Sequence, residues 1–162
     1  MGNDRQLGPE DLFSLQEAGR VLRTRGWAAN FTFRSMMAEW DWLVSEIERG
    51  YDEPVYEYLN DLSCRDWLAQ IRPLITEPAQ MMLDHELLPL DARFRAATLD
   101  DGGEALSRVR RAERLDGWWW KRVPRLLAED LATPWWRLSA TDARSRWISL
   151  RPVPPGPSGG HG

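Results

Sequence analysis

The chain has 162 residues, which fits one domain, and its apolar fraction of 43% is enough for a buried core. A net charge of −4 and a pI near 5.3 argue against a general nucleic-acid binder, and no apolar run approaches the roughly 18 residues of a membrane span. The only cysteine, Cys64, excludes an internal disulfide, and no signal peptide follows Met1, so a reduced cytosolic protein is expected.

Two helices are predicted first, over residues 9–26 and 32–50. In the second, apolar side chains recur at the spacing of a single helical face. Thr32 is a suitable cap at its start, and Gly50 suits the left-handed backbone that follows many helices. Trp42 points away from the apolar face, so the core does not require its indole.

The next predicted segment, residues 52–75, carries two apolar faces about half a turn apart. Val55 and Leu59 belong to the first face and Trp67 belongs to the second. A straight helix cannot bury both faces against one core, so we predict a short helix, a kink near residues 60–63, and a second helix.

The rest of the chain predicts shorter elements. A helix beginning at residue 76 is expected to be interrupted by Pro89 and to continue as a separate helical stretch up to a loop at residues 100–103. No strand alternation is evident in residues 1–100. Beyond the loop, the pattern indicates a basic helix at 104–117, an extended end to 118–124, a short helix at 125–132, a hairpin or arginine-rich helix at 132–150, and a disordered Pro/Gly-rich tail at 152–162.

These elements predict a mainly α fold. We expect a single-domain bundle of five or six helices over residues 1–151, with short β pieces after residue 117. The predicted core contains Phe33, Met37, Trp40, Val44, Ile47, Leu59, Leu68, Ile71 and Phe94.

Charge is divided unevenly along the chain. Residues 1–101 carry 10 arginines against 19 acids, a net −9, and residues 102–162 carry 10 arginines and Lys121 against six acids, a net +5. The acidic part is expected to attract a basic partner, or the two parts attract each other within one fold. The bias toward arginine is typical of a GC-rich bacterial genome.

Enzyme signatures are missing from the sequence. Two histidines and one cysteine, with no paired spacing, argue against a metal site, and no phosphate-binding, dinucleotide-binding or nucleophile motif occurs. His85 is interpreted as a half-buried helix residue and Cys64 as a packed thiol. We therefore expect no cofactor and no metal.

A row of carboxylates is the one acidic cluster of note. Glu53, Glu57 and Asp61 are four residues apart and share a helical face. Such a row can hold Mg²⁺, but it lies opposite the apolar face, which favours a solvated ridge suited to a basic partner surface. Arg65 is placed to pair with Asp61 and to hold the predicted kink together.

Three consecutive tryptophans followed by two cations form the most unusual stretch, DGWWWKRVP at 116–124. Neither a helix nor a strand hides three adjacent rings on one face, so at least one ring is expected to meet a partner or line a pocket. A nucleic-acid alternative uses the rings to stack on bases and the nearby cations to bind phosphate, within residues 107–122. Its cations are Arg108, Arg110, Arg111, Lys121 and Arg122.

The stretches WDWLVSEIERGY, YEYLNDLSCRD and GWWWKRVP, which span residues 40–125, resemble a family of small, tryptophan-rich bacterial proteins. The resemblance rests on the glutamates and the Gly-Tyr pair at the end of the first stretch, the Asn-Asp-Leu run of the second with Arg65 and Asp66, and the tryptophan block before Val123-Pro124. It implies a compact, mainly helical bacterial protein and carries over no activity or site residues.

The functional hypothesis is a non-enzymatic cytosolic protein that binds a protein partner, of the immunity-protein or antitoxin type, with no membrane contact. Tryptophan and arginine dominate the energetics of many protein interfaces, which directs attention to the aromatic and acidic positions. The candidate partner-binding residues are Trp42, Glu53, Glu57, Asp61, Trp118, Trp119, Trp120, Lys121 and Arg122. The alternatives are a small-molecule pocket or small enzyme walled by tryptophans, with Glu46, Glu57 or Asp61 as polar groups, and the nucleic-acid binder above.

Overall fold

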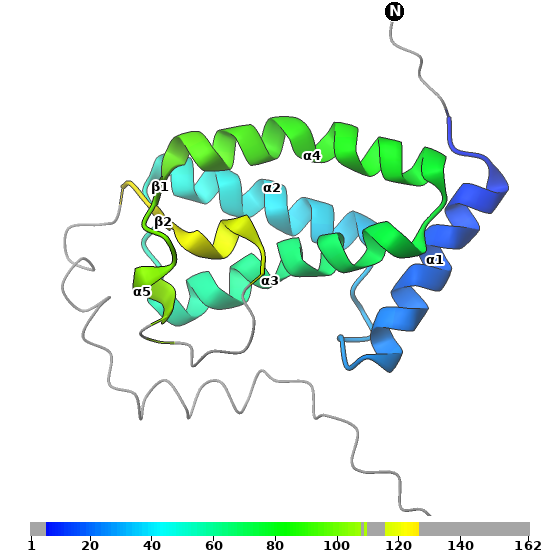
Figure 1. The fold of residues 1–162 in the computed structure, drawn as a ribbon, viewed down its shortest axis with the longest axis horizontal. Coiled ribbons are helices and arrows are strands. Elements are labelled where there is room, and N and C mark those ends of the chain that lie inside the picture. Colours follow the sequence, from blue (N-terminus) through cyan, green and yellow to red (C-terminus); the bar gives the residue numbers. More distant parts are fainter. Residues whose placement is uncertain (1–5, 108, 110–115, 127–162) are drawn as a thin grey trace, which may run out of the picture.

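The computed structural model describes residues 6–107, 109 and 116–126. Within this part the chain is mainly helical, as predicted, with a small two-stranded sheet (Figure 1). Its elements are α1 (Pro9–Thr24), α2 (Phe33–Arg49), α3 (Val55–Ile71), the 3₁₀ turn η1 (Arg72–Leu74), α4 (Glu77–Ala97), β1 (Thr98–Asp100), α5 (Glu104–Ser107), the 3₁₀ turn η2 (Trp118–Lys121) and β2 (Arg122–Pro124).

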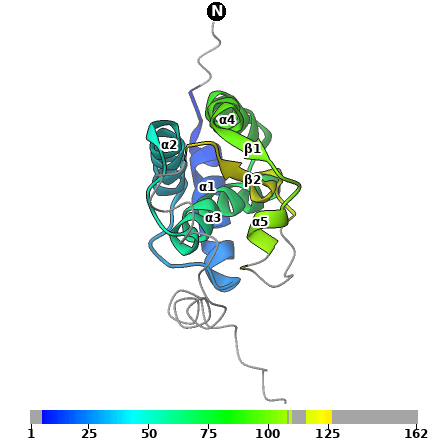
Figure 2. The same cartoon turned by 90° about the vertical axis from the view of Figure 1, so that its left-hand side faces the viewer.

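Helices α2, α3 and α4 run side by side and enclose the centre of the molecule, while α1 crosses one end (Figures 1 and 2). The sheet, α5 and η2 lie toward the other end. The core side chains predicted from the sequence are all buried, so the apolar spacing identified the inward faces correctly: Phe33, Met37, Trp40, Val44, Ile47, Leu59, Leu68, Ile71 and Phe94.

Helix α2 forms as its sequence predicts. The Thr32 hydroxyl accepts a hydrogen bond from the Ser35 backbone N–H at 3.1 Å, and the Ser35 hydroxyl accepts one from the Thr32 N–H at 2.9 Å. Gly50 follows the last turn with a φ of 103°, a conformation that favours glycine.

The predicted kink in the third helical segment is wrong. Helix α3 runs unbroken from Val55 to Ile71, and its two apolar faces are both buried. The reason is its central position, since α2, α1 and η2 pack against it from different sides. A helix with neighbours on several sides can bury more than one stripe, and the argument for a break assumed a single neighbour.

The predicted interruption at Pro89 is also wrong, because α4 continues through that residue. Pro89 has no backbone N–H, so it cannot donate the helical hydrogen bond to the carbonyl oxygen of His85, four residues before it. Both Pro89 and His85 are exposed. An unpaired carbonyl on the solvent side is met by water at little cost, and the helix is not obliged to end there. The expectation that His85 is half-buried is corrected at the same time.

Strand β1 lies within the first hundred residues, where the sequence predicts no strand. It pairs antiparallel with β2, and Thr98 lies opposite Pro124. A three-residue strand is too short to show alternation, so its partner could not be read from the sequence. The extended end of the 118–124 stretch, and with it a β piece after residue 117, is confirmed by β2.

Helical structure in the predicted 104–117 segment is described only for α5, at Glu104–Ser107. Three predicted segments lie almost entirely outside the described residues: the helix at 125–132, the undecided segment 132–150 and the tail at 152–162. The predicted domain boundary at 151 also lies outside them.

Pro89 gives a test of this account of α4. Pro89→Ala restores a backbone hydrogen bond and a good helix former, offset in part by a more flexible unfolded chain, so we expect the free energy of unfolding to rise by about 1–2 kcal/mol. Pro78→Ala is the matched control, because Pro78 lies in the first turn, where no N–H partner is lost. Urea unfolding measures both variants, and an unchanged or lowered stability of Pro89→Ala would contradict the argument.

Candidate protein-binding surface

The tryptophan block folds into the 3₁₀ turn η2, which explains how three adjacent rings are accommodated. With about three residues per turn, consecutive side chains point about 120° apart. Trp119 and Trp120 are buried, and Trp118 is half-buried. Trp119 and Trp120 therefore leave the candidate surface, because their rings lie in the core.

A single carboxylate fixes the two buried indoles. Oδ1 of Asp66, on α3, accepts hydrogen bonds from Nε1 of Trp119 at 2.8 Å and from Nε1 of Trp120 at 2.7 Å. Both indole donors are thus satisfied inside the protein, where an unpaired N–H would cost roughly 1–3 kcal/mol. The contact attaches η2 to α3.

Next to it lies a buried ion pair that joins α3 to α4. Arg65 donates from Nε at 3.1 Å and from Nη2 at 2.9 Å to the two carboxylate oxygens of Asp91, and Trp40 Nε1 donates to the same carboxylate at 3.1 Å. The guanidinium also lies 4.5 Å from the ring centroid of Trp119. The predicted pairing of Arg65 with Asp61 is wrong, because Arg65 turns inward to α4.

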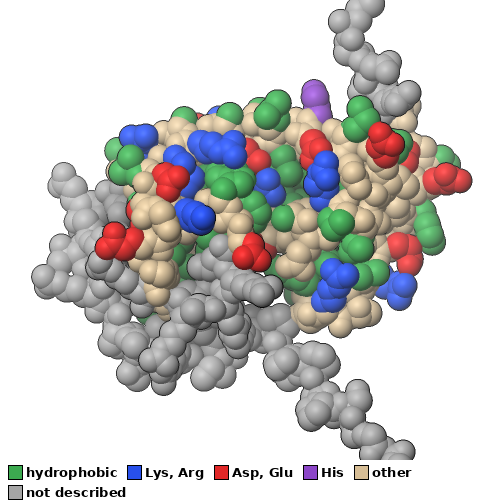
Figure 3. All heavy atoms as spheres, viewed as in Figure 1, with side chains coloured by type: hydrophobic (Ala, Val, Ile, Leu, Met, Phe, Trp, Pro, Cys, Tyr) green, Lys and Arg blue, Asp and Glu red, His purple; other side chains and the backbone are tan. Residues whose placement is uncertain are grey.

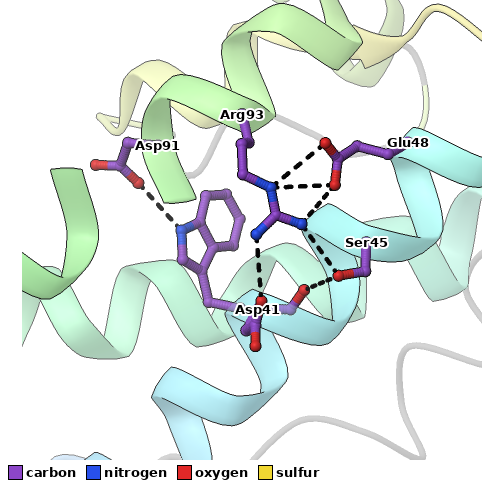
Figure 4. Close-up of polar contacts among 6 residues, drawn as sticks. Asp41, Ser45, Glu48, Asp91 and Arg93 are labelled. Carbon is purple, nitrogen blue, oxygen red and sulfur yellow. Dashed lines mark hydrogen bonds and ion pairs between the residues drawn. The ribbon is translucent and has the colours of Figure 1, made fainter. Parts of the chain in front are cut away.

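Figure 4 shows further polar contacts that join α4 to α2. Arg93 of α4 donates hydrogen bonds to Glu48 and Ser45 and lies 3.6 Å from the Asp41 carboxylate. These groups are more exposed than the Arg65–Asp91 pair, so water screens them and they contribute less to stability.

The remaining members of the block also have structural contacts. The Arg95 guanidinium lies 3.8 Å from the ring centroid of Trp118 and covers part of that ring. Arg122 donates from Nε to the Thr98 hydroxyl at 2.8 Å and from Nη2 to the Arg95 carbonyl at 3.0 Å, at the C-terminal end of α4. Lys121 is exposed. Arg122 thus caps a helix, and among the described residues of the block Lys121 is exposed while Trp118 and Arg122 are half-buried. The other cations of the nucleic-acid alternative, Arg108, Arg110 and Arg111, lie outside the described residues.

A second region does present an aromatic side chain to solvent. Trp42, on the outer side of α2, is 43% exposed. Glu39 and Glu46 lie one turn before and after it, and Glu39 is close enough to Asp61 of α3 to affect it electrostatically. The predicted row on one helical face is wrong at Glu53, because α3 begins at Val55 and only Glu57 and Asp61 lie on it. We call this region the α2–α3 face; its members are Glu39, Trp42, Glu46, Glu53, Glu57 and Asp61.

Asp61 is the unusual member of the face. Its Oδ2 accepts a hydrogen bond from the Tyr51 hydroxyl at 2.7 Å. Burial raises the pKa of Asp61 from 3.8 to about 6; the Tyr51 hydrogen bond opposes this, and the negative charges of Glu57 and Glu39 add to it. The interpretation of the whole row as solvated is therefore wrong at Asp61, which is held half-buried among like charges.

Other chemistry on the described residues is limited. Cys64 is buried and its thiol lies 3.0 Å from the Asp61 carbonyl oxygen, as expected for a packed thiol, and burial raises the pKa of that thiol. Among the residues the structure describes, no group of three or more His, Cys, Asp or Glu side chains is placed to hold a metal ion. No helix in that part of the chain is long and apolar enough to cross a membrane.

Sequence reasoning missed four residues that shape this region. Glu39 could have been found, because it lies one helical turn before Trp42. Tyr51, Asp66 and Asp91 could not, because their roles depend on partners brought near by the fold.

No protein-family model, curated protein or solved structure matches the chain.

The first prediction from this region concerns the close approach at Gly117. A Cβ there would lie 2.2 Å from two ring carbons of Trp119, which Asp66 holds in place. We expect Gly117→Ala to lower the free energy of unfolding by about 2 kcal/mol or more. Gly8→Ala is the control, since Gly8 has nearly the same φ and a Cβ there would lie 3.6 Å from the Asp11 carboxylate, an ordinary contact. Equal losses in the two variants, measured by urea unfolding, would refute the packing argument.

The second prediction concerns Asp61. Because its folded-state pKa is raised, Asp61 contributes stability below pH 3.8 that is lost as the pH rises through about 6. Asp61→Asn keeps an acceptor for Tyr51 and removes the charge. We expect the free energy of unfolding of the variant to rise relative to that of the wild type as the pH rises across this window. The difference should reach on the order of 1 kcal/mol after solvent screening.

Thermal unfolding across the pH range measures this gain. Asp52→Asn is the control, because it removes one charge from an exposed position nearby and leaves Asp61 intact. If Asp61→Asn followed the wild-type pH profile throughout, the Asp61 carboxylate would not be destabilised by its surroundings.

Proposed function

We propose that this chain is a non-catalytic binding protein of the bacterial cytosol whose α2–α3 face docks a basic protein partner, as immunity proteins and antitoxins do. The observation that carries the proposal is Trp42, a large indole held 43% exposed on a helix whose core-facing stripe is complete without it. Tryptophan is the residue type most enriched at the energetic centres of protein interfaces.

The charges around Trp42 favour a cationic partner. Glu39 and Glu46 flank the indole on α2, with Arg49 3.6 Å from the Glu46 carboxylate, and Glu53, Glu57 and Asp61 add further carboxylates. An arginine or lysine of a partner would lie over the ring and between these acids, gaining both a cation–π contact and charge neutralisation. We therefore propose a basic surface or a basic helix as the docking partner.

Asp61 strengthens the same proposal. A carboxylate that is half-buried among like charges lowers the stability of the free protein, and an incoming cation would relieve that cost. Complex formation is then expected to weaken as Asp61 is protonated, at pH values below about 6.

The alternative functions have less support. Trp119 and Trp120 are in the core and bonded to Asp66, so they have no free face for a nucleobase or a ligand. Arg122 is engaged with the end of α4, and the glutamates one turn before and after the exposed indole would repel phosphate.

Affinity capture from a lysate of the source organism, with and without nuclease, tests the proposal. We expect a stoichiometric basic protein to be retained by the wild type regardless of nuclease, and its retention to fall at least tenfold with Trp42→Ala. The matched control is Phe13→Ala, an aromatic on α1 that is 62% exposed. Both side chains are solvent-exposed, so each substitution should change stability by less than about 0.5 kcal/mol.

Three results would count against the proposal. Loss of the partner with Phe13→Ala but not with Trp42→Ala would move the interface to α1. Nuclease-sensitive nucleic acid in place of a protein would support the basic-aromatic alternative. A protein recovered alone would rule out a stable complex under these conditions.

A further inference from the structure

The outer side of α4 carries an apolar stripe that the described elements of the fold leave uncovered. Met81 is 57% exposed and Leu88 is 70% exposed, and they lie on the same side of the helix. His85, Ala92 and Ala96 continue this side at helical spacing, and all three are exposed. Figure 3 shows hydrophobic side chains on both sides of the histidine along the edge of the molecule formed by α4.

Side-chain size changes along the stripe. The larger members, Met81, His85 and Leu88, occupy the first half of the exposed side, and the small residues Ala92 and Ala96 occupy the second. Two such helices that run antiparallel place the large side chains of each over the small ones of the other, and this fills space better than a parallel arrangement does.

Charge along α4 has the same arrangement. Asp84 and Glu86 flank the first half of the stripe, and Arg93 and Arg95 flank the second half. The midpoint between Asp84 and Arg95 falls between Pro89 and Leu90, which is also the midpoint between Glu86 and Arg93. In an antiparallel pair each flank of a helix faces the same flank of its partner. In one register, Asp84 of each copy therefore lies opposite Arg95 of the other on one flank, and Glu86 lies opposite Arg93 on the other flank.

We propose that α4 is a self-association surface that pairs antiparallel with α4 of a second copy of this chain, about a two-fold axis that crosses the stripe beside Leu88 and Pro89. A two-fold contact of this kind requires a surface that complements itself. The stripe meets that requirement in side-chain size about the midpoint between Leu88 and Pro89, and in charge about a midpoint one residue further along the helix. This inference is independent of the proposed function, because the α2–α3 face is not part of it.

The apolar stripe supplies the affinity and the charges select the direction. Three of the four flanking charges already have partners within the chain: Asp84 accepts two hydrogen bonds from Arg72, Arg93 donates to Glu48 (Figure 4), and Arg95 lies on the ring of Trp118. New pairs across the axis therefore favour one register more than they add binding energy. A contact confined to one helix per copy lies at the low end of specific interfaces, below about 1,200 Å² in total. A dimer that dissociates at micromolar to millimolar concentration is therefore expected.

Sedimentation velocity of the full chain at rising concentration tests self-association. We expect wild-type protein to shift from monomer to dimer, and Leu88→Glu to raise the dissociation constant at least tenfold. Leu12→Glu is the matched control, because Leu12 is 52% exposed on α1 and should tolerate the same charge without affecting the dimer. Circular dichroism verifies that both variants are folded. A wild type that stays monomeric to millimolar concentration, or a dimer that Leu88→Glu leaves intact, would overturn the proposal.

Disulfide trapping tests the direction of pairing, with buried Cys64 giving no background. Leu88→Cys lies next to the proposed axis, where two copies come within reach of a disulfide, whereas two copies of Ala96→Cys lie about 20 Å apart along the helices. We expect oxidation to cross-link the first variant and not the second. Cross-linking of both variants would indicate a parallel pair, and cross-linking of neither would indicate a different interface; either result overturns the proposed register.

Discussion

The carboxylate of Asp66 is the contact on which the non-helical end of this structure depends. One oxygen accepts both indole N–H groups of Trp119 and Trp120, so two large rings enter the core without an unsatisfied donor. The turn that carries them then leads directly into β2, whose pairing with β1 completes the end of α4. Asp66 thus attaches η2 to α3, and the strand pairing then attaches the chain after η2 to the end of α4.

The aromatic residues divide into two groups with different physical roles. Three rings of the first group lie against cations: Arg65 lies near the buried Trp119 and Trp40, and Arg95 lies on the half-buried Trp118. These charges are paired or stacked, which is how a core tolerates them. Trp42 forms the second group, because its ring is exposed and lies near carboxylates. This position makes Trp42 a candidate interface residue, whereas the rings of the first group pack in the core or against it.

Much of the fold could be predicted from periodicity, because α2 and the core positions depend on local spacing alone. The unbroken α3 could not, since burial of a second stripe depends on which helices surround it. The partner of Arg65 could not be predicted either. Asp61 is the nearer candidate in sequence, but α4 brings the distant Asp91 close to Arg65 in the fold. At the candidate site, the exposure of Trp42 followed from the helical wheel, whereas the half-burial of Asp61 depends on Tyr51.

The distance along the chain between Asp66 and its two donors has a consequence for folding order. The contacts span 53 and 54 residues, whereas the capping contacts of α2 span three. Closing so long a loop carries an entropic cost that local contacts do not. During synthesis α3 is complete well before the tryptophans emerge from the ribosome, so the inner side of the bundle remains hydrated around Asp66 until the last of its elements arrives.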